Sequence, residues 1–287
     1  MTDANGADIA YRVPWRSGAM RSGAHRSRFS GTSGQHRGVV SLLENPDPRR
    51  IAIRESLRDP FEQVLVRSSE QLSTIQIAVL IDVSASMSFV GRARKIALAC
   101  DIATAISDSA GRYGDPCAIL AFDNKLRWDL SIHVSRARSA RAAVLENLRK
   151  FEPSARGMEG AIEAASLLSG SRKLVFVISD FLWDVAAAAD IARVLGHHDV
   201  IAIALDDSRQ LDDLPEWGLL NLVDHETGRR SLVVMRPSLK AAWRSAIRTR
   251  RNSINECFSQ AGRPILEMRD RIDWERLMTH VMYGSLP

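Results

Sequence analysis

The chain has 287 residues, of which 45% are hydrophobic and 25% charged, and its formal net charge is +5. This composition is that of a globular protein with a full-sized core, in one large domain or two small ones. The N-terminus lacks the apolar stretch of a secretion signal, and no run of about 18 apolar residues predicts a membrane span. The three cysteines, Cys100, Cys117 and Cys257, lack zinc-ligand spacing and suit a reducing compartment. We therefore expect a cytoplasmic protein without structural zinc.

The N-terminal 38 residues are predicted to be a basic flexible arm. Residues 10–40 hold no Asp or Glu, many Gly and Ser, and these arginines: Arg12, Arg16, Arg21, Arg26, Arg28 and Arg37. Such an arm can contact nucleic acid or an acidic surface, although a solvated tail is the simpler interpretation. Residues 39–74 are expected to form an N-terminal extension that packs on the domain, with a strand near residues 64–66.

Residues 75–235 alternate apolar strands with amphipathic helices, which predicts βαβ units and a largely parallel sheet. Strands are expected at 75–81, 117–122, 173–179 and 200–205, and an antiparallel edge strand at 125–130. Helices are expected at 92–113, 135–150, 158–168 and 184–195, and a hairpin at 219–223 and 231–235. Residues 236–287 are expected to complete the domain with a helix at 237–260, a strand at 264–268 and a helix at 274–282.

Polar side chains follow two of the predicted strands at the point where each strand ends. Asp82, Ser84 and Ser86 come directly after the first strand, and Asp180 follows the strand at 173–179. Hard divalent cations prefer oxygen ligands, and ligands of open α/β sheets bind at the carboxyl ends of the strands. We therefore predict that the four side chains converge at one sheet edge and form a site for Mg²⁺ or another divalent cation. Alternatively, the small polar residues simply cap the next helix.

The segment Asp82-Val-Ser-Ala-Ser86 resembles the metal-ion-dependent adhesion site of von Willebrand factor A-like (vWA) domains. The resemblance implies a Rossmann-like α/β fold, with a mostly parallel central sheet and helices on both faces, here with an N-terminal extension and C-terminal helices. In that family the two serines ligate the cation directly and the aspartate acts through water, roles that fall on Ser84, Ser86 and Asp82. The family's later aspartate corresponds to Asp180.

The chain departs from the vWA pattern at the family's threonine ligand. The matching loop is residues 153–160, and Arg156 stands where the family has Thr. A guanidinium has no acceptor and cannot ligate a cation. Either Ser154 or Glu159 replaces the threonine, or Arg156 itself fills the site with positive charge. We expect weak or no cation binding in consequence.

Further motifs narrow the resemblance to one group of vWA-like proteins. With Ile-Ser-Asp-Phe at 178–181 and Asp-His-Glu-Thr-Gly at 224–228, the chain looks like the vWA-like proteins of the domain-of-unknown-function family fifty-eight. These proteins commonly accompany MoxR-type AAA+ ATPases. Residues 57–67 resemble the branch from bacterial methanol-oxidation clusters, which implies a part in methanol dehydrogenase assembly or calcium insertion. The family's Asp-Trp pair after Arg-x-Ile is replaced here by Ala52-Ile53.

We interpret the protein as a non-enzymatic, chaperone-like interaction protein, whose cation site holds an acidic side chain of a partner. The partners implied by the resemblance are a MoxR-type AAA+ ATPase and its client protein. Trp217 with Asp212 and Asp213 is predicted to form a docking rim, because aromatic anchors dominate interfaces and rim charges steer encounter. A solvated acidic loop is the simpler interpretation.

Two other classes of function remain as alternatives. One is a Mg²⁺-dependent phosphoryl-transfer enzyme with Asp82 as nucleophile, although Ser84 cannot supply the general acid that this chemistry needs. The other is an RNA-binding vWA protein that uses the arginine-rich arm. Few aromatic residues interleave with those arginines, so base stacking is poorly provided for and nucleic acid is not the expected partner.

Overall fold

The computed structural model describes residues 9–19, 21–210, 215–223 and 230–283. The chain divides into two compact units. One, here called the α/β domain, comprises residues 1–12, 76–112 and 116–287. The other, the hairpin unit, comprises residues 13–75 and 113–115.

The centre of the α/β domain is a six-stranded sheet with the order β10-β7-β6-β3-β4-β5. Its strands are β3 (Ile77–Asp82), β4 (Cys117–Phe122), β5 (Ile132–Ser135), β6 (Leu174–Ser179), β7 (Asp199–Asp206) and β10 (Leu266–Arg269). All neighbours are parallel except β5, which runs antiparallel to β4. Every residue of β3, β4 and β6 is buried, as expected of strands covered on both faces.

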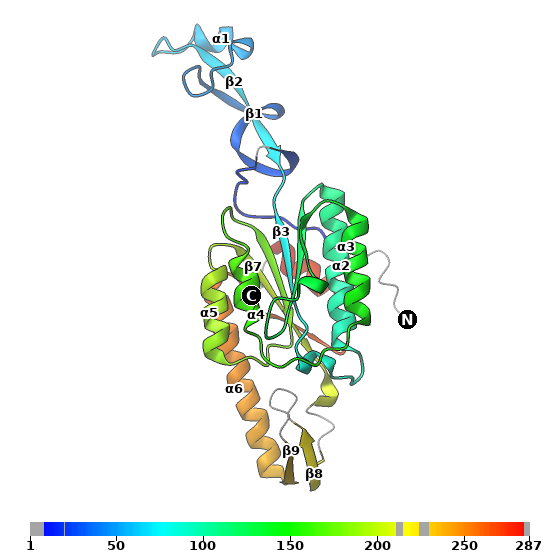
Figure 1. The fold of residues 1–287 in the computed structure, drawn as a ribbon. Helices are drawn as coiled ribbons and strands as arrows, with labels where there is room; N and C mark the ends of the chain where they lie inside the picture. Colours follow the sequence, from blue (N-terminus) through cyan, green and yellow to red (C-terminus); the bar gives the residue numbers. More distant parts are fainter. Residues whose placement is uncertain (1–8, 20, 211–214, 224–229, 284–287) are drawn as a thin grey trace. The chain divides into compact units, whose positions relative to one another are not determined.

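Helices cover both faces of this sheet (Figure 1). On one side lie α2 (Lys95–Tyr113) and α3 (Arg138–Lys150); on the other lie α4 (Gly160–Ser166), α5 (Val185–Leu195) and α6 (Pro237–Ala261). The helix α7 (Trp274–Tyr283) follows β10. Alternate strand residues point to opposite faces, so Leu80 and Val177 share a core cluster with Ile191 and Phe258 on the side of α5 and α6. The predicted Rossmann-like α/β fold class, a mostly parallel central sheet with helices on both faces, is confirmed.

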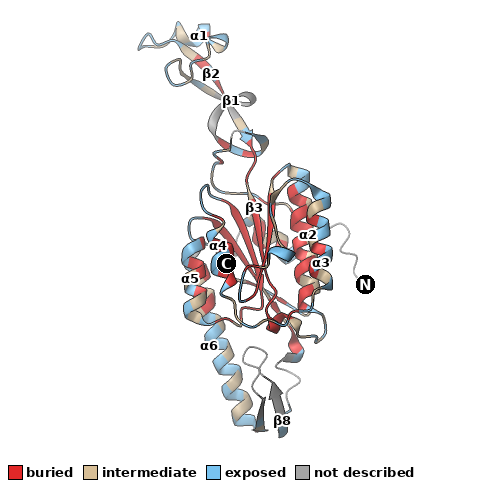
Figure 2. Cartoon of the chain, viewed as in Figure 1, coloured by how far each residue is buried: buried red, intermediate tan, exposed pale blue. Residues whose placement is uncertain are grey.

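The burial of residues follows this layered arrangement of the sheet and its helices. Figure 2 shows the central strands of the sheet buried, whereas the outward sides of α5 and α6 are exposed. Two further strands, β8 (Gly218–Val223) and β9 (Arg230–Met235), pair antiparallel as a sheet of their own. The predicted hairpin is thus confirmed. Within the described residues, no helix has the length and apolar character needed to cross a membrane.

The predicted edge strand at residues 125–130 is wrong. Leu126 makes only an isolated bridge to Phe122, and a short helix, η3 (Trp128–Leu130), follows it. The guanidinium of Arg127 pairs with Asp123 at 2.9 Å and stabilises a tight turn. Ser131 Oγ then accepts a hydrogen bond from Ala121 N, and the antiparallel edge strand begins only afterwards, as β5.

The hairpin unit consists mainly of β1 (Ser22–Ser41), paired antiparallel with β2 (Leu65–Ser73) through several register shifts. Two short helices, η1 (Pro48–Arg50) and α1 (Ile53–Ser56), lie between the strands. This differs from the predicted flexible arm of residues 1–38 and from a boundary at residue 39. The composition of β1 lacks an apolar alternation, but backbone hydrogen bonds with β2 do not require one. Buried Asp115 also accepts from His25 Nε2 at 2.8 Å and from Ile75 N.

Candidate functional site

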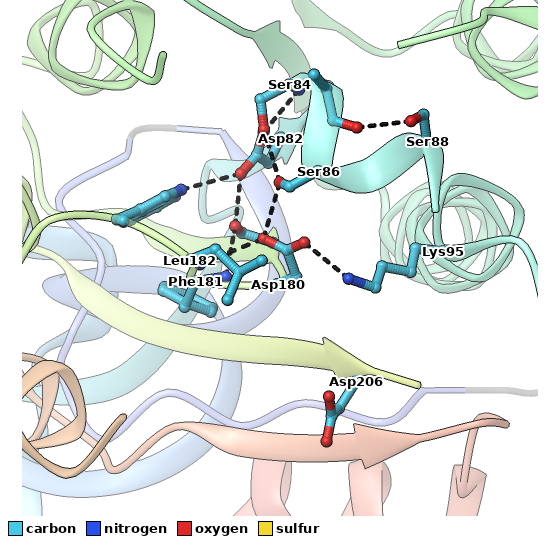
Figure 3. Close-up of polar contacts among 12 residues, drawn as sticks. Asp82, Ser84, Ser86, Ser88, Lys95, Asp180, Phe181, Leu182 and Asp206 are labelled. Carbon is cyan, nitrogen blue, oxygen red and sulfur yellow. Dashed lines mark hydrogen bonds and ion pairs between the residues drawn. The ribbon is translucent and has the colours of Figure 1, made fainter. Parts of the chain in front are cut away.

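The structure brings Ser84, Ser86 and Asp180 into contact at the carboxyl ends of β3 and β6 (Figure 3). The hydroxyl oxygens of Ser84 and Ser86 are 3.2 Å apart. Ser86 Oγ donates to Asp180 Oδ1, also over 3.2 Å. Because β3 and β6 are parallel neighbours, with Ile81 beside Ile178, their ends meet at one edge. Asp82, the fourth predicted residue, lies at the same end of β3.

The serine loop, residues 83–88, is shaped by Asp82. Its Oδ1 accepts a hydrogen bond from Ser84 N at 2.8 Å, a turn typical of aspartate after a strand. The chain then enters the short helix η2 (Ala85–Ser88). Ser84 precedes η2, but in the part of the chain that the structure describes its side chain makes no capping hydrogen bond. Helix capping therefore does not account for this hydroxyl.

Asp82 is fully buried and held on both oxygens. Its Oδ2 accepts from Ser179 Oγ at 2.6 Å and from Trp183 Nε1 at 3.0 Å. Burial, and then the nearby charge of Asp180, raise the pKa of Asp82 to about 6. Trp183 was not predicted as part of the site, because an indole donor leaves no periodic signal in the sequence.

Lys95 is the positive charge of the site. Its Nζ lies 2.8 Å from Asp180 Oδ2, and both side chains are only 2% exposed. Asp180 Oδ1 also accepts from Leu182 N at 3.3 Å. Sequence reasoning missed Lys95, although a signal existed: it shares the apolar helix face of Ala99 and Ile102, four and seven residues later.

The loop of residues 153–160 reaches the serine loop through the backbone. Ala85 N donates to the carbonyl oxygen of Ala155 over 2.7 Å. The side chains of Ser154, Arg156 and Glu159 are exposed. The Glu159 carboxylate lies over Gly157, where a Cβ atom would come within 2.3 Å of it. Arg156 was one predicted source of positive charge at the site; the cation that pairs with Asp180 in this structure is Lys95.

The residues of the site fit a divalent cation in spacing but not in charge. Octahedral Mg²⁺ holds oxygens at about 2.1 Å, which places neighbouring ligands about 3 Å apart, close to the separations among Ser84, Ser86 and Asp180. However, Lys95 already neutralises one of the two carboxylates, and a divalent ion would place two more positive charges beside its ammonium. Among the described residues, no group of three or more His, Cys, Asp or Glu side chains is arranged to hold a metal.

Trp217 is the part of the predicted docking rim that the structure describes. Trp217 is 69% exposed and immediately precedes β8, whereas Asp212 and Asp213 lie outside the described residues. Leu219 stands directly opposite Val234 in the β8–β9 ladder, Leu232 lies two residues from Val234 on the same face, and Trp217 lies in the bend just before β8. All four side chains are more than half exposed. We call them the apolar face of the β8–β9 hairpin.

Comparison with known families matches residues 50–253, more than half of the chain, to the family described as "Protein of unknown function DUF58". The chain belongs to the DUF58 family. Its relatives include the uncharacterized protein Rv1480 of Mycobacterium tuberculosis, 26% identical over 264 residues that cover 84% of this chain and 80% of the relative. The uncharacterized protein MAV169 of Mycobacterium avium is 29% identical over 114 residues, 40% of this chain and 67% of the relative.

Solved structures similar to this DUF58 protein include the conserved hypothetical protein BatB from Bacteroides thetaiotaomicron. It has a TM-score of 0.47 and 13% identity, and the match covers 72% of this chain and 95% of that one. A von Willebrand factor type A structure from Catenulispora acidiphila has a TM-score of 0.40 and 12% identity, with 75% and 42% of the two chains covered. Likenesses of this size say nothing about function.

Proposed function

We propose that this DUF58 protein is a non-catalytic, chaperone-like interaction protein. The observation that carries the proposal is the burial and hydrogen bonding of Asp82, the residue best placed to be a nucleophile. It is 0% exposed, and its two oxygens accept three hydrogen bonds, from Ser84 N, Ser179 Oγ and Trp183 Nε1. A nucleophile or general base must reach the substrate, which this carboxylate does not. The contacts of Asp82 therefore support a structural role and speak against phosphoryl transfer.

The partner that we propose is a MoxR-type AAA+ ATPase, together with the client protein that it remodels, in the cytoplasm. This rests on the family resemblance of the chain. The resemblance of residues 57–67 extends the proposal to methanol dehydrogenase maturation, including assembly or calcium insertion. The apolar face of the β8–β9 hairpin supports binding of a protein, because exposed aromatic and aliphatic side chains in one patch are typical of interaction surfaces.

Binding to the ATPase tests the proposal directly. The purified chain should bind the MoxR-type ATPase of its own organism in surface plasmon resonance. It should show no Mg²⁺-dependent hydrolysis of a generic phosphatase substrate. Phosphatase activity that is lost in Asp82→Asn would overturn the non-catalytic assignment. Absence of ATPase binding, with and without nucleotide, would remove the proposed partner.

A further inference from the structure

Lys95 reaches the site from the first turn of α2 and is 1% exposed. Burying an ammonium is costly unless an opposite charge compensates it, and here the compensating group is Asp180, 2.8 Å away. Figure 3 shows the two oxygens of Asp180 divided between two partners: one faces Ser86 and the other faces Lys95. The carboxylate is thus shared between a hydroxyl and a fixed cation.

The position of Lys95 is set by a further carboxylate at the same sheet edge. Asp207, directly after β7 and 2% exposed, accepts from Arg92 N at 2.7 Å. A Cβ atom at Gly91 would come within 2.1 Å of Asp207 Oδ1, so glycine permits this close approach. The loop before α2 is therefore held against the end of β7, which places the start of α2, and with it Lys95, beside Asp180.

We propose that Lys95 is the built-in cation of this site and excludes a divalent metal ion from it. Asp82 and Asp180 with one ammonium leave a single net negative charge, which a divalent ion would overcompensate. The same two carboxylates without the lysine would match a divalent ion in charge. The oxygens of Ser84, Ser86 and Asp180 already have the spacing of neighbouring ligands, so the lysine is what separates this closed site from a metal site.

The burial of the site explains why it needs a cation of its own. Counted over the whole residue, Ser84 is 3% exposed, and Ser86 and Asp180 are each 5% exposed. Carboxylates buried to this degree need a compensating positive charge, and the Lys95 ammonium supplies it in place of a metal ion. The inference concerns the same site as the proposed function but does not depend on the identity of the partner.

Calorimetry with Mg²⁺ and Mn²⁺ on the purified chain tests the proposal. The wild type should bind neither ion at millimolar concentration. Lys95→Met should bind one ion per chain, at least about tenfold more tightly than the wild type, because the repelling charge is gone. Adding Ser86→Ala to Lys95→Met should abolish that binding. Micromolar binding by the wild type, or binding by Lys95→Met no tighter than by the wild type, would overturn the proposal.

Two controls keep the test decisive. Arg156→Thr restores the hydroxyl of the vWA pattern at an exposed position and leaves Lys95 in place; it should still not bind. Binding by Arg156→Thr alone would show that Lys95 does not exclude the ion.

If Lys95→Met does not fold by itself, Mg²⁺ or Mn²⁺ should restore its folded circular dichroism spectrum, because the ion supplies the missing charge. Failure of both ions to restore folding would contradict the proposal.

Discussion

Trp183 donates its indole Nε1–H to Asp82 Oδ2 over 3.0 Å, which joins the loop after β6 to the end of β3. Trp183 is 4% exposed, and the centroid of its ring lies 4.7 Å from that of Phe181 and 6.5 Å from that of Phe258. Aromatic packing on the α6 side of the sheet therefore fixes the donor that holds the buried carboxylate.

Trp183→Phe should lower the free energy of unfolding by about 1–3 kcal/mol, because it removes a donor from a buried carboxylate while keeping an aromatic ring. Urea denaturation measures the change. The matched control is Trp128→Phe, since Trp128 is 58% exposed on η3, and its effect should stay within about 0.5 kcal/mol. Equal effects of the two substitutions would show that the hydrogen bond to Asp82 contributes little.

His198 should make the stability of the α/β domain depend on pH. Burial, and then the charge of Lys173, lower the pKa of His198 from 6.5 to about 4. The folded state binds this proton less tightly than the unfolded state. The stability contribution is therefore fully present above pH 6.5 and is lost as the pH falls from 6.5 towards 4, by up to about 3 kcal/mol.

Thermal or urea denaturation between pH 4 and pH 7 measures this dependence. His198→Gln should flatten the curve in the range between the two pKa values, because its side chain does not titrate. His133→Gln, at an exposed position on β5, is the matched control and should leave the curve unchanged. A curve for His198→Gln that is as steep as that of the wild type would contradict the prediction.

Lys173→Met should lower the free energy of unfolding by about 2 kcal/mol or more, because it removes three charged hydrogen bonds between a buried lysine and backbone carbonyl groups. The Lys173 ammonium donates to the carbonyl oxygens of Leu168, Ser169 and Ser171 at 2.8–2.9 Å. It thereby stabilises the turn between α4 and β6. Lys150→Met is the control: its ion pair with Glu146 is exposed and should change stability by less than about 0.5 kcal/mol in the same urea titration.

If the proposed MoxR-type ATPase partner docks here, Trp217→Ser should weaken that binding by tenfold or more, since exposed aromatic anchors contribute about 2 kcal/mol or more where they are buried by a partner. Surface plasmon resonance measures the change, with Trp128→Ser as a matched exposed tryptophan in the same domain. Asp212→Asn combined with Asp213→Asn should mainly slow association and reduce its salt dependence. If Trp217→Ser binds as tightly as Trp128→Ser, the β8–β9 hairpin is not the docking surface.

Much of the α/β domain could be predicted because its strands are buried on both faces. The apolar runs at Ile77–Asp82 and Leu174–Ser179 identify two parallel strands and also the points where they end. The convergence of Ser84, Ser86 and Asp180 follows, since carboxyl ends of neighbouring parallel strands meet. The edge strand β5 was predicted several residues too early and the paired strand β1 was missed, because edge strands and polar hairpins are held by backbone bonds that composition does not reveal.

By itself, the sequence determined the oxygen side chains of the site and their place at the sheet edge. Only the tertiary structure decided the net charge of the site and how far its side chains are shielded from solvent. Lys95 meets Asp180 across 85 residues and Trp183 meets Asp82 across 101, contacts that no local spacing encodes. Both arise from packing around the sheet, of α2 in one case and of an aromatic cluster in the other, and such packing sets which buried charges are paired.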